Sequence, residues 1–167
     1  MRTSVGRLWA PWRSAFVTKP AARRCVFCAA KRAASDRHAL VVARGASVFA
    51  LLNLYPYNNG HLMIAPYRHV AQLERLRPQE WAEMLVLLRR LTATLRRLLH
   101  PQGFNIGLNL GRLAGAGIPG HVHVHLVPRW IGDTNFMTTI GRTKVISQSL
   151  EELYRQVAEP SKRRRRR

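Results

Sequence analysis

Three histidines that alternate with apolar residues are the most chemically suggestive feature of the chain. Residues 121–127 read His-Val-His-Val-His-Leu-Val. A period of two is typical of a β-strand, so His121, His123 and His125 are expected on one face, roughly 6.5–7 Å apart. Three imidazolium cations that close would repel, so at least one ring should be neutral near pH 7. A neutral imidazole can be a nucleophile, a general base or a metal ligand, and the pattern alone leaves these roles open.

The only two cysteines, Cys25 and Cys28, are separated by two residues. This spacing is typical of a metal site or a redox pair, and two cysteines cannot form a disulfide framework. The surroundings of the pair do not suggest a βαβ unit, which disfavours thioredoxin-like chemistry. Because the sequence also contains neither a secretory signal nor an apolar run long enough to span a membrane, we expect a cytoplasmic protein with no membrane partner.

The charge of the chain is strongly unbalanced. Lysine and arginine total 28 against 8 acidic residues, giving a formal net charge of +20 in 167 residues. Such an excess favours polyanionic partners, including nucleotides, polyphosphates and RNA. The Lys-Arg run at the C-terminus is expected to bind polyanions without specificity and in a salt-sensitive way, because no RNA-recognition signature accompanies it.

The elements that must position these residues can be outlined from periodicity. Apolar residues at helical spacing predict a long helix that begins near Pro78 and ends before Pro101 and Gly103. A shorter helix is expected over Ser147–Val157. A short apolar stretch and four strands are expected at Ala39–Ala43, Val48–Leu54, His61–Pro66, Phe104–Leu110 and His121–Pro128.

Several segments resemble the histidine triad (HIT) family of nucleotide hydrolases and transferases. Residues 121–127 match every position of the family motif, in which histidines alternate with apolar residues. The likeness within the family is greatest to the actinobacterial-type diadenosine tetraphosphate phosphorylases. The other segments that carry the resemblance are 8–13, 25–28, 53–61, 105–111, 128–130 and 132–136.

The resemblance implies an α+β fold with a HIT-like antiparallel sheet of about five strands, one long helix and a C-terminal helix. The expected organisation is an N-terminal arm over 1–24, a HIT domain over 25–158 and a disordered basic tail over 159–167. Domains of this family usually form homodimers whose sheets continue across the interface.

The resemblance also implies catalytic roles. His123 would attack the α-phosphorus of an adenine nucleotide and form a covalent nucleotidyl-histidine. His125 and His61 would hold the non-bridging oxygens or orient the nucleophile. Asn53 matches a position that contacts the ribose hydroxyls, although an asparagine there could also simply form a turn. Asn109 matches a polar position beside the α-phosphate.

One departure from the family pattern concerns the acceptor. Many relatives have a glutamine where this chain has Gly117, and a glycine leaves room for an anion bound by backbone N–H groups. This favours inorganic phosphate as acceptor and phosphorolysis of diadenosine tetraphosphate to ADP and ATP. The alternatives are a HIT hydrolase that releases AMP from phosphoramidates, adenylated substrates or dinucleoside polyphosphates, and a non-catalytic nucleotide- or RNA-binding protein.

A structural metal is the last implication of the resemblance. In metal-containing relatives the Cys-x-x-Cys pair is completed by two histidines, which match His69 and His121 here. Cys25, Cys28, His69 and His121 would then form a closed zinc site of the Cys₂His₂ type. The competing interpretation is that the two cysteines are reduced free thiols.

Overall fold

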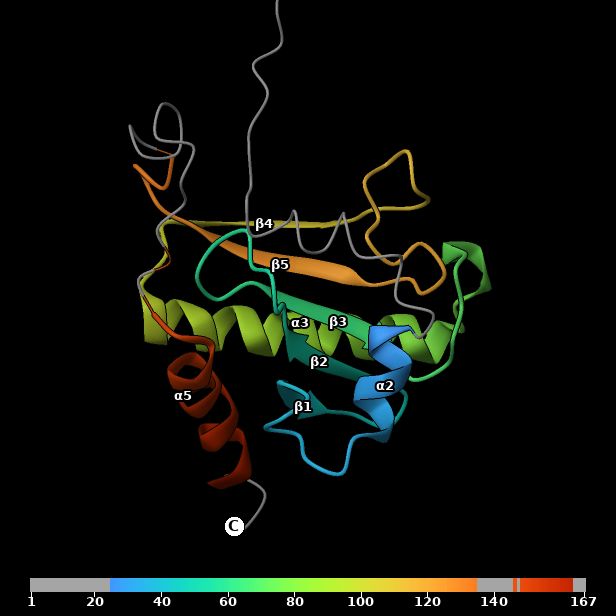
Figure 1. Cartoon of the computed structure of the whole chain (residues 1–167), viewed down its shortest axis with the longest axis horizontal. Helices are drawn as coiled ribbons and strands as arrows, with labels where there is room; N and C mark the ends of the chain where they lie inside the picture. The colour runs from blue at the N-terminus through green and yellow to red at the C-terminus, as the bar shows by residue number, and fades with distance from the viewer. Residues whose placement is uncertain (1–24, 135–145, 147, 164–167) are drawn as a thin grey trace, which may run out of the picture.

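The computed structural model describes residues 25–134, 146 and 148–163. Five strands form one antiparallel sheet in the order β1-β2-β3-β5-β4 (Figure 1). The predicted α+β class and the five-stranded antiparallel sheet are therefore confirmed. The arm expected over 1–24 lies outside the described residues. The strands are β1 (Val41–Arg44), β2 (Val48–Leu52), β3 (Leu62–Pro66), β4 (Gly103–Leu108) and β5 (Val124–Arg129).

Two helices cover one face of the sheet. The long helix α3 (Pro78–Leu99) turns an apolar stripe inward, because its buried residues Met84, Leu87, Leu91 and Leu95 recur three or four positions apart. The C-terminal helix α5 (Leu150–Arg163) adds Leu153, Tyr154 and Val157 to the same core. In Figure 1 α3 runs along the sheet and α5 lies below one end of it. This face is the main core and carries none of the triad histidines.

A short helix covers part of the other face. Helix α2 (Val26–Arg32) buries Phe27 and Ala30 against β1, β2 and β3 (Figure 1). With seven residues it is too short to show a helical period, so periodicity did not predict it. A single 3₁₀ turn, η1 (Leu73–Arg75), precedes α3. The triad histidines face the α2 side of the sheet, where Phe27 of α2 contacts the rings of His121 and His123, so this layer builds the site.

Several element boundaries differ from the sequence expectations by a few residues, and two of these differences matter most. Regular pairing of β5 begins at Val124, so His121 and His123 lie on the irregular segment that leads into the strand. In that segment the side chain of His121 contacts Cys25 and the Pro66 carbonyl, and the side chain of His123 contacts the His121 carbonyl. Helix α5 continues to Arg163 and so enters the segment 159–167, where we expected disorder. Residues 164–167 lie outside the described part.

Within the described residues, no helix combines the length and the apolar character that a membrane span requires.

Candidate active site

His123 is held as a neutral ring with one defined tautomer. Its Nδ1 lies 2.8 Å from the backbone carbonyl oxygen of His121. A carbonyl only accepts, so Nδ1 carries the proton and Nε2 keeps its lone pair. The ring is 4 % exposed and packs 4.7 Å from the ring of Phe27 in α2. This burial lowers the pKa of His123, which favours the neutral form at pH 7. The result is an imidazole that can attack an electrophile through Nε2.

A second hydrogen-bond chain fixes the tautomers of His61 and His125. The backbone N–H of Tyr57 donates to Nδ1 of His61 at 3.0 Å, so the proton of the His61 ring must reside on Nε2. Nε2 of His61 lies 2.9 Å from Nδ1 of His125 and donates to it. A neutral His125 then has its own proton on Nε2. The two Nε2 atoms therefore differ in character: that of His123 offers a lone pair and that of His125 carries an N–H donor.

His123 and His125 lie close enough to act on one group. Their ring centroids are 4.7 Å apart, and the centroids of His61 and His125 are 5.1 Å apart. An electrophilic phosphoryl group attacked by His123 would therefore have an N–H donor beside it. Developing negative charge on its oxygens is stabilised by such a preorganised donor. The structure thus brings together the three histidines predicted to be catalytic.

Asn53, directly after β2, makes two side-chain contacts. Its Oδ1 accepts the backbone N–H of Tyr55 at 2.9 Å, which forms the local turn anticipated as the alternative to ribose binding. Its Nδ2 lies 3.3 Å from Nδ1 of His61, the acceptor nitrogen in the chain described above. Asn53 also lines the cavity next to the histidines. The predicted contact with a ribose stays a prediction.

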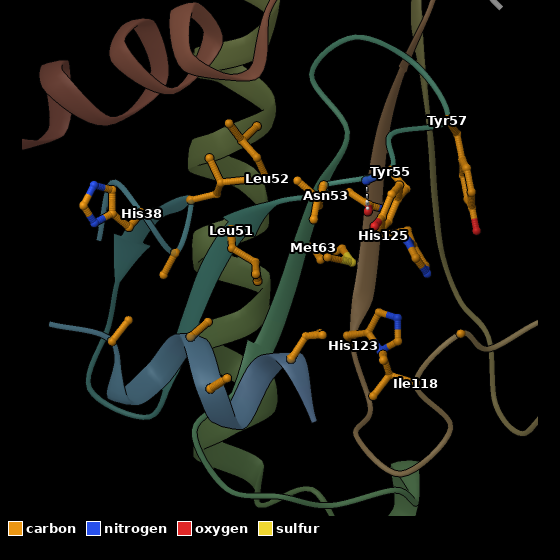
Figure 2. Close-up of a pocket in the computed structure, with 18 residues that line it drawn as sticks. His38, Leu51, Leu52, Asn53, Tyr55, Tyr57, Met63, Ile118, His123 and His125 are labelled. Carbon is orange, nitrogen blue, oxygen red and sulfur yellow. Dashed lines mark hydrogen bonds between the residues drawn. The ribbon is translucent and has the colours of Figure 1, made fainter. Parts of the chain in front are cut away.

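A cavity of about 460 Å³ opens beside His123 and His125. This volume is within the range that small-molecule sites occupy. Side chains from α2, from β2 and from Met63 of β3 form apolar walls, and Figure 2 shows the two histidines at one end, near Asn53 and Tyr55. The cavity is thus a pocket that is apolar along its length and polar where the histidines meet it.

The two remaining predicted nucleotide contacts are placed differently. Gly117 lines the cavity together with Ile118, on the loop that joins β4 to β5. Asn109 follows β4 and lies outside the cavity lining, with its amide nitrogen 4.0 Å from the position that a Cβ on Gly115 would take. Gly115 has a φ of +85°, a conformation that favours glycine. Both predicted roles stay predictions.

The four predicted metal ligands converge at the start of α2. The ligand atoms of Cys25, Cys28, His69 and His121 all lie within 4.8 Å of one another. Nδ1 of His121 is 3.3 Å from Sγ of Cys25 and 3.8 Å from Sγ of Cys28, and Nδ1 of His69 is 3.3 Å from Sγ of Cys28. Sulfur and nitrogen ligands of one tetrahedral zinc ion are about 3.6 Å apart, by Zn–S and Zn–N bond lengths of about 2.3 and 2.0–2.1 Å.

The protonation of His121 also fits a metal ligand. Nε2 of His121 donates to the backbone carbonyl of Pro66 at 2.9 Å, so Nδ1 faces the cysteines with a lone pair. Metal-bound histidines commonly donate their second N–H in this way. Burial lowers the pKa of His121 to about 4, so the ring is neutral. The described residues therefore contain a Cys₂His₂ set that could hold a metal ion.

An ion pair holds the segment that carries His69. Arg68 donates to both carboxylate oxygens of Glu80, at 3.0 and 2.8 Å. The same carboxylate accepts the backbone N–H of Arg77 at 2.8 Å and so caps α3. Glu80 is 4 % exposed. This carboxylate therefore joins the start of α3 to the chain next to a metal-ligand position.

Replacing Glu80 with glutamine should lower the free energy of unfolding, because the buried carboxylate of Glu80 loses its charge and its ion pair with the partly exposed Arg68. The hydrogen bond from Arg68 lowers the pKa of Glu80 below its ordinary value of 4.5. The contribution of the pair is therefore complete above pH 4.5 and is lost as the pH falls through the lowered pKa. Urea unfolding of both proteins at several pH values checks this: a difference that does not shrink below pH 4.5 would contradict it.

Sequence reasoning missed a polar network at the far end of β5. The side-chain amide of Asn58 donates to the carbonyl oxygen of Pro128 at 2.9 Å and to Asp133 at 2.7 Å. Asp133 also pairs with Arg129, which holds the pKa of the Asp133 carboxyl well below its usual range. The network ties the loop before His61 to the triad strand. Its residues lie in segments 53–61, 128–130 and 132–136 that carry the family resemblance, but nothing in the sequence predicted the contacts between them.

Comparison with known proteins identifies the class. The HIT domain family model matches residues 34–130. A curated protein named AP-4-A phosphorylase from Mycobacterium tuberculosis is 44% identical over 165 residues, covering 94% of this chain and 85% of that protein. The chain therefore belongs to the HIT family, as the sequence motif predicted.

Two further relatives extend the comparison. An adenosine 5′-monophosphoramidase from Schizosaccharomyces pombe is 30% identical over 105 residues, covering 63% of this chain and 74% of that protein. The crystal structure of a zinc-bound histidine triad family protein from Mycobacterium smegmatis superposes with a TM-score of 0.65 at 26% identity, covering 85% of this chain and 96% of that one.

Proposed function

We propose that this protein is a nucleotidyltransferase that phosphorolyses diadenosine tetraphosphate to ADP and ATP. The observation that carries the proposal is the tautomer pattern at the cavity, in which His123 presents a lone pair and His125 presents an N–H donor. The similarity to an AP-4-A phosphorylase over most of both chains supports the choice of substrate.

In the first step Nε2 of His123 attacks the α-phosphorus. A P–N bond forms, the bond from that phosphorus to the bridging oxygen breaks, and ATP leaves with the electron pair. The His121 carbonyl accepts a hydrogen bond from the Nδ1–H of His123 and stabilises the positive charge that the ring gains. The Nε2–H of His125 donates a hydrogen bond to an oxygen of the reacting phosphate and keeps its proton throughout. Splitting one displacement into two in this way is the advantage of covalent catalysis.

In the second step an oxygen of inorganic phosphate attacks the nucleotidyl-histidine. The P–N bond breaks, ADP forms, and His123 returns to its neutral state. Gly117 lines the cavity and has no side chain to fill it, which supports entry of phosphate along the β4–β5 loop. Asn53 at the end of β2 would hold the ribose, and Asn109 would lie beside the phosphates.

We also propose that Cys25, Cys28, His69 and His121 hold a zinc ion. Zinc in a closed Cys₂His₂ set has no open coordination position, so it supplies rigidity and takes no part in the chemistry. His121 connects the site to catalysis, since its side chain belongs to the metal set and its carbonyl orients His123. Thiolate ligands require reduced cysteines, which supports a cytoplasmic location.

The edge strand β4 supports a homodimer. In the order of the sheet β4 is terminal and pairs only with β5 among the described strands. Its sequence, Gly-Phe-Asn-Ile-Gly-Leu, contains no charge and no proline, and Ile106 is 51% exposed. Such an edge invites pairing with another chain. The molar mass in solution checks this proposal, and a monomer at micromolar concentration would refute it.

The test of the reaction is product analysis with diadenosine tetraphosphate, with and without inorganic phosphate. ADP and ATP in equal amounts, formed only with phosphate, are expected. AMP and ATP formed regardless of phosphate would make the protein a hydrolase. An absence of turnover with both this substrate and adenosine phosphoramidate would favour a non-catalytic nucleotide-binding protein.

A further inference from the structure

The cavity is longer than its catalytic end, and its polar groups are unevenly distributed. Five polar lining side chains belong to the catalytic end or to the turn after β2. The sixth, His38, lies at the opposite end of the pocket, before β1 (Figure 2). The five are Asn53, Tyr55, Tyr57, His123 and His125.

The stretch between the two ends is lined by small and apolar side chains. Ala29 and Ala33 of α2 contribute one wall, and Leu51 and Met63 of the sheet contribute another. Such walls suit the flat faces of a purine ring but offer no partner to its polar edge. The polar edge of the base would lie at the end of the cavity where His38 is exposed, so a hydrogen bond there competes with water and contributes the modest net amount of one such bond.

The placement of the reacting phosphate sets the direction of the nucleotide. The α-phosphate must lie at Nε2 of His123, and the base must extend away from it along the apolar stretch. The side-chain hydrogen-bonding group at the far end of the described cavity is the imidazole of His38. A neutral imidazole carries an N–H donor on one ring nitrogen and an acceptor lone pair on the other, and the acceptor can take a hydrogen bond from the 6-amino group of adenine.

We propose that His38 is a specificity-determining residue that hydrogen-bonds the 6-amino edge of the adenine ring in the nucleotide transferred to His123. This inference rests on the proposed function, because it takes the nucleotide to react at His123. His38 sits outside the triad motif and the metal set, and its place in the sequence gives no hint of this role.

The test compares two ligands in two proteins, by calorimetric binding that needs no turnover. The ligands are AMP and purine riboside 5′-monophosphate, which lacks the 6-amino group. The wild-type protein should bind AMP roughly three- to tenfold more tightly than the analogue, as one hydrogen bond allows. In His38→Ala this preference should fall to about one through weaker AMP binding, with the analogue little affected.

Two control variants make the result specific. His38→Gln keeps a donor and an acceptor and should retain part of the preference. Arg32→Ala removes an exposed α2 side chain that does not line the cavity, and should leave the preference unchanged.

Each outcome separates the inference from the proposed reaction. Equal weakening of both ligands in His38→Ala would show a structural role and overturn the inference, as would an unchanged preference. AMP binding that shows the expected preference in a protein without phosphorolysis would sink the proposed reaction and leave the role of His38 standing. Failure of the wild-type protein to bind AMP would overturn both.

Discussion

Replacing His123 with alanine should reduce phosphorolysis of diadenosine tetraphosphate by at least roughly 10³-fold. The reason is that Nε2 of His123 is the proposed nucleophile, with its tautomer fixed by the His121 carbonyl. AMP affinity should change far less, because apolar walls and not this ring form most of the cavity. Turnover measured by product analysis, together with AMP binding by calorimetry, checks both parts.

A matched control removes a histidine remote from the cavity. His100 is exposed at the C-terminal end of α3 with a φ of 47°, a conformation that asparagine tolerates. His100→Asn should therefore retain full activity. Covalent labelling gives a second criterion: radiolabelled nucleotide should be trapped on the wild-type protein and not on His123→Ala. Substantial turnover by His123→Ala would exclude the covalent mechanism.

Removing the metal should have the largest effect on stability. Metal held about a thousandfold above its dissociation constant stabilises a fold by about 4 kcal/mol, which corresponds to about 10 °C in melting temperature for a chain of this size. Nucleotide affinity should fall as well, since Cys25 and Cys28 anchor α2 and α2 forms a wall of the cavity. Calorimetric melting and AMP binding before and after chelation measure the two effects.

The Cys28→Ser variant provides the control for nonspecific effects of the chelator. It should melt at a lower temperature from the outset, and chelator should shift it little further. Added zinc should restore the chelated wild-type protein and not the variant. A wild-type preparation never exposed to chelator should contain about one zinc ion per chain, and less than a tenth of an equivalent would count decisively against the site.

The sequence by itself determined the sheet, the long helix and the identity of the reactive groups. The period of two over residues 121–127 placed three histidines on one side of the chain, and the 3.6-residue period of α3 defined the main core. These features are local, because each follows from side-chain alternation within one segment. The spacing of the two cysteines likewise indicated a metal or redox site.

The proton positions that make the histidines different were decided only by the tertiary structure. Which nitrogen carries the proton depends on partners that the fold supplies: the Tyr57 N–H acts through His61 on His125, which is 64 residues from His61. The alternation of side chains along a strand carries no information about such distant partners. The sequence also predicted His121 within a regular strand. In the structure His121 precedes the strand, and its side chain contacts the cysteines and the Pro66 carbonyl.

The cavity was equally a product of the fold. Helix α2 is too short to show a period, yet it forms a wall of the pocket and begins at the metal set. No functional role could be predicted for His38 from the sequence, because a single histidine in a loop belongs to no recognisable pattern. It joins the pocket only because β1 and β2 pair and α2 packs over them. Packing between segments distant in sequence thus decided where the reactive groups meet and what they can bind.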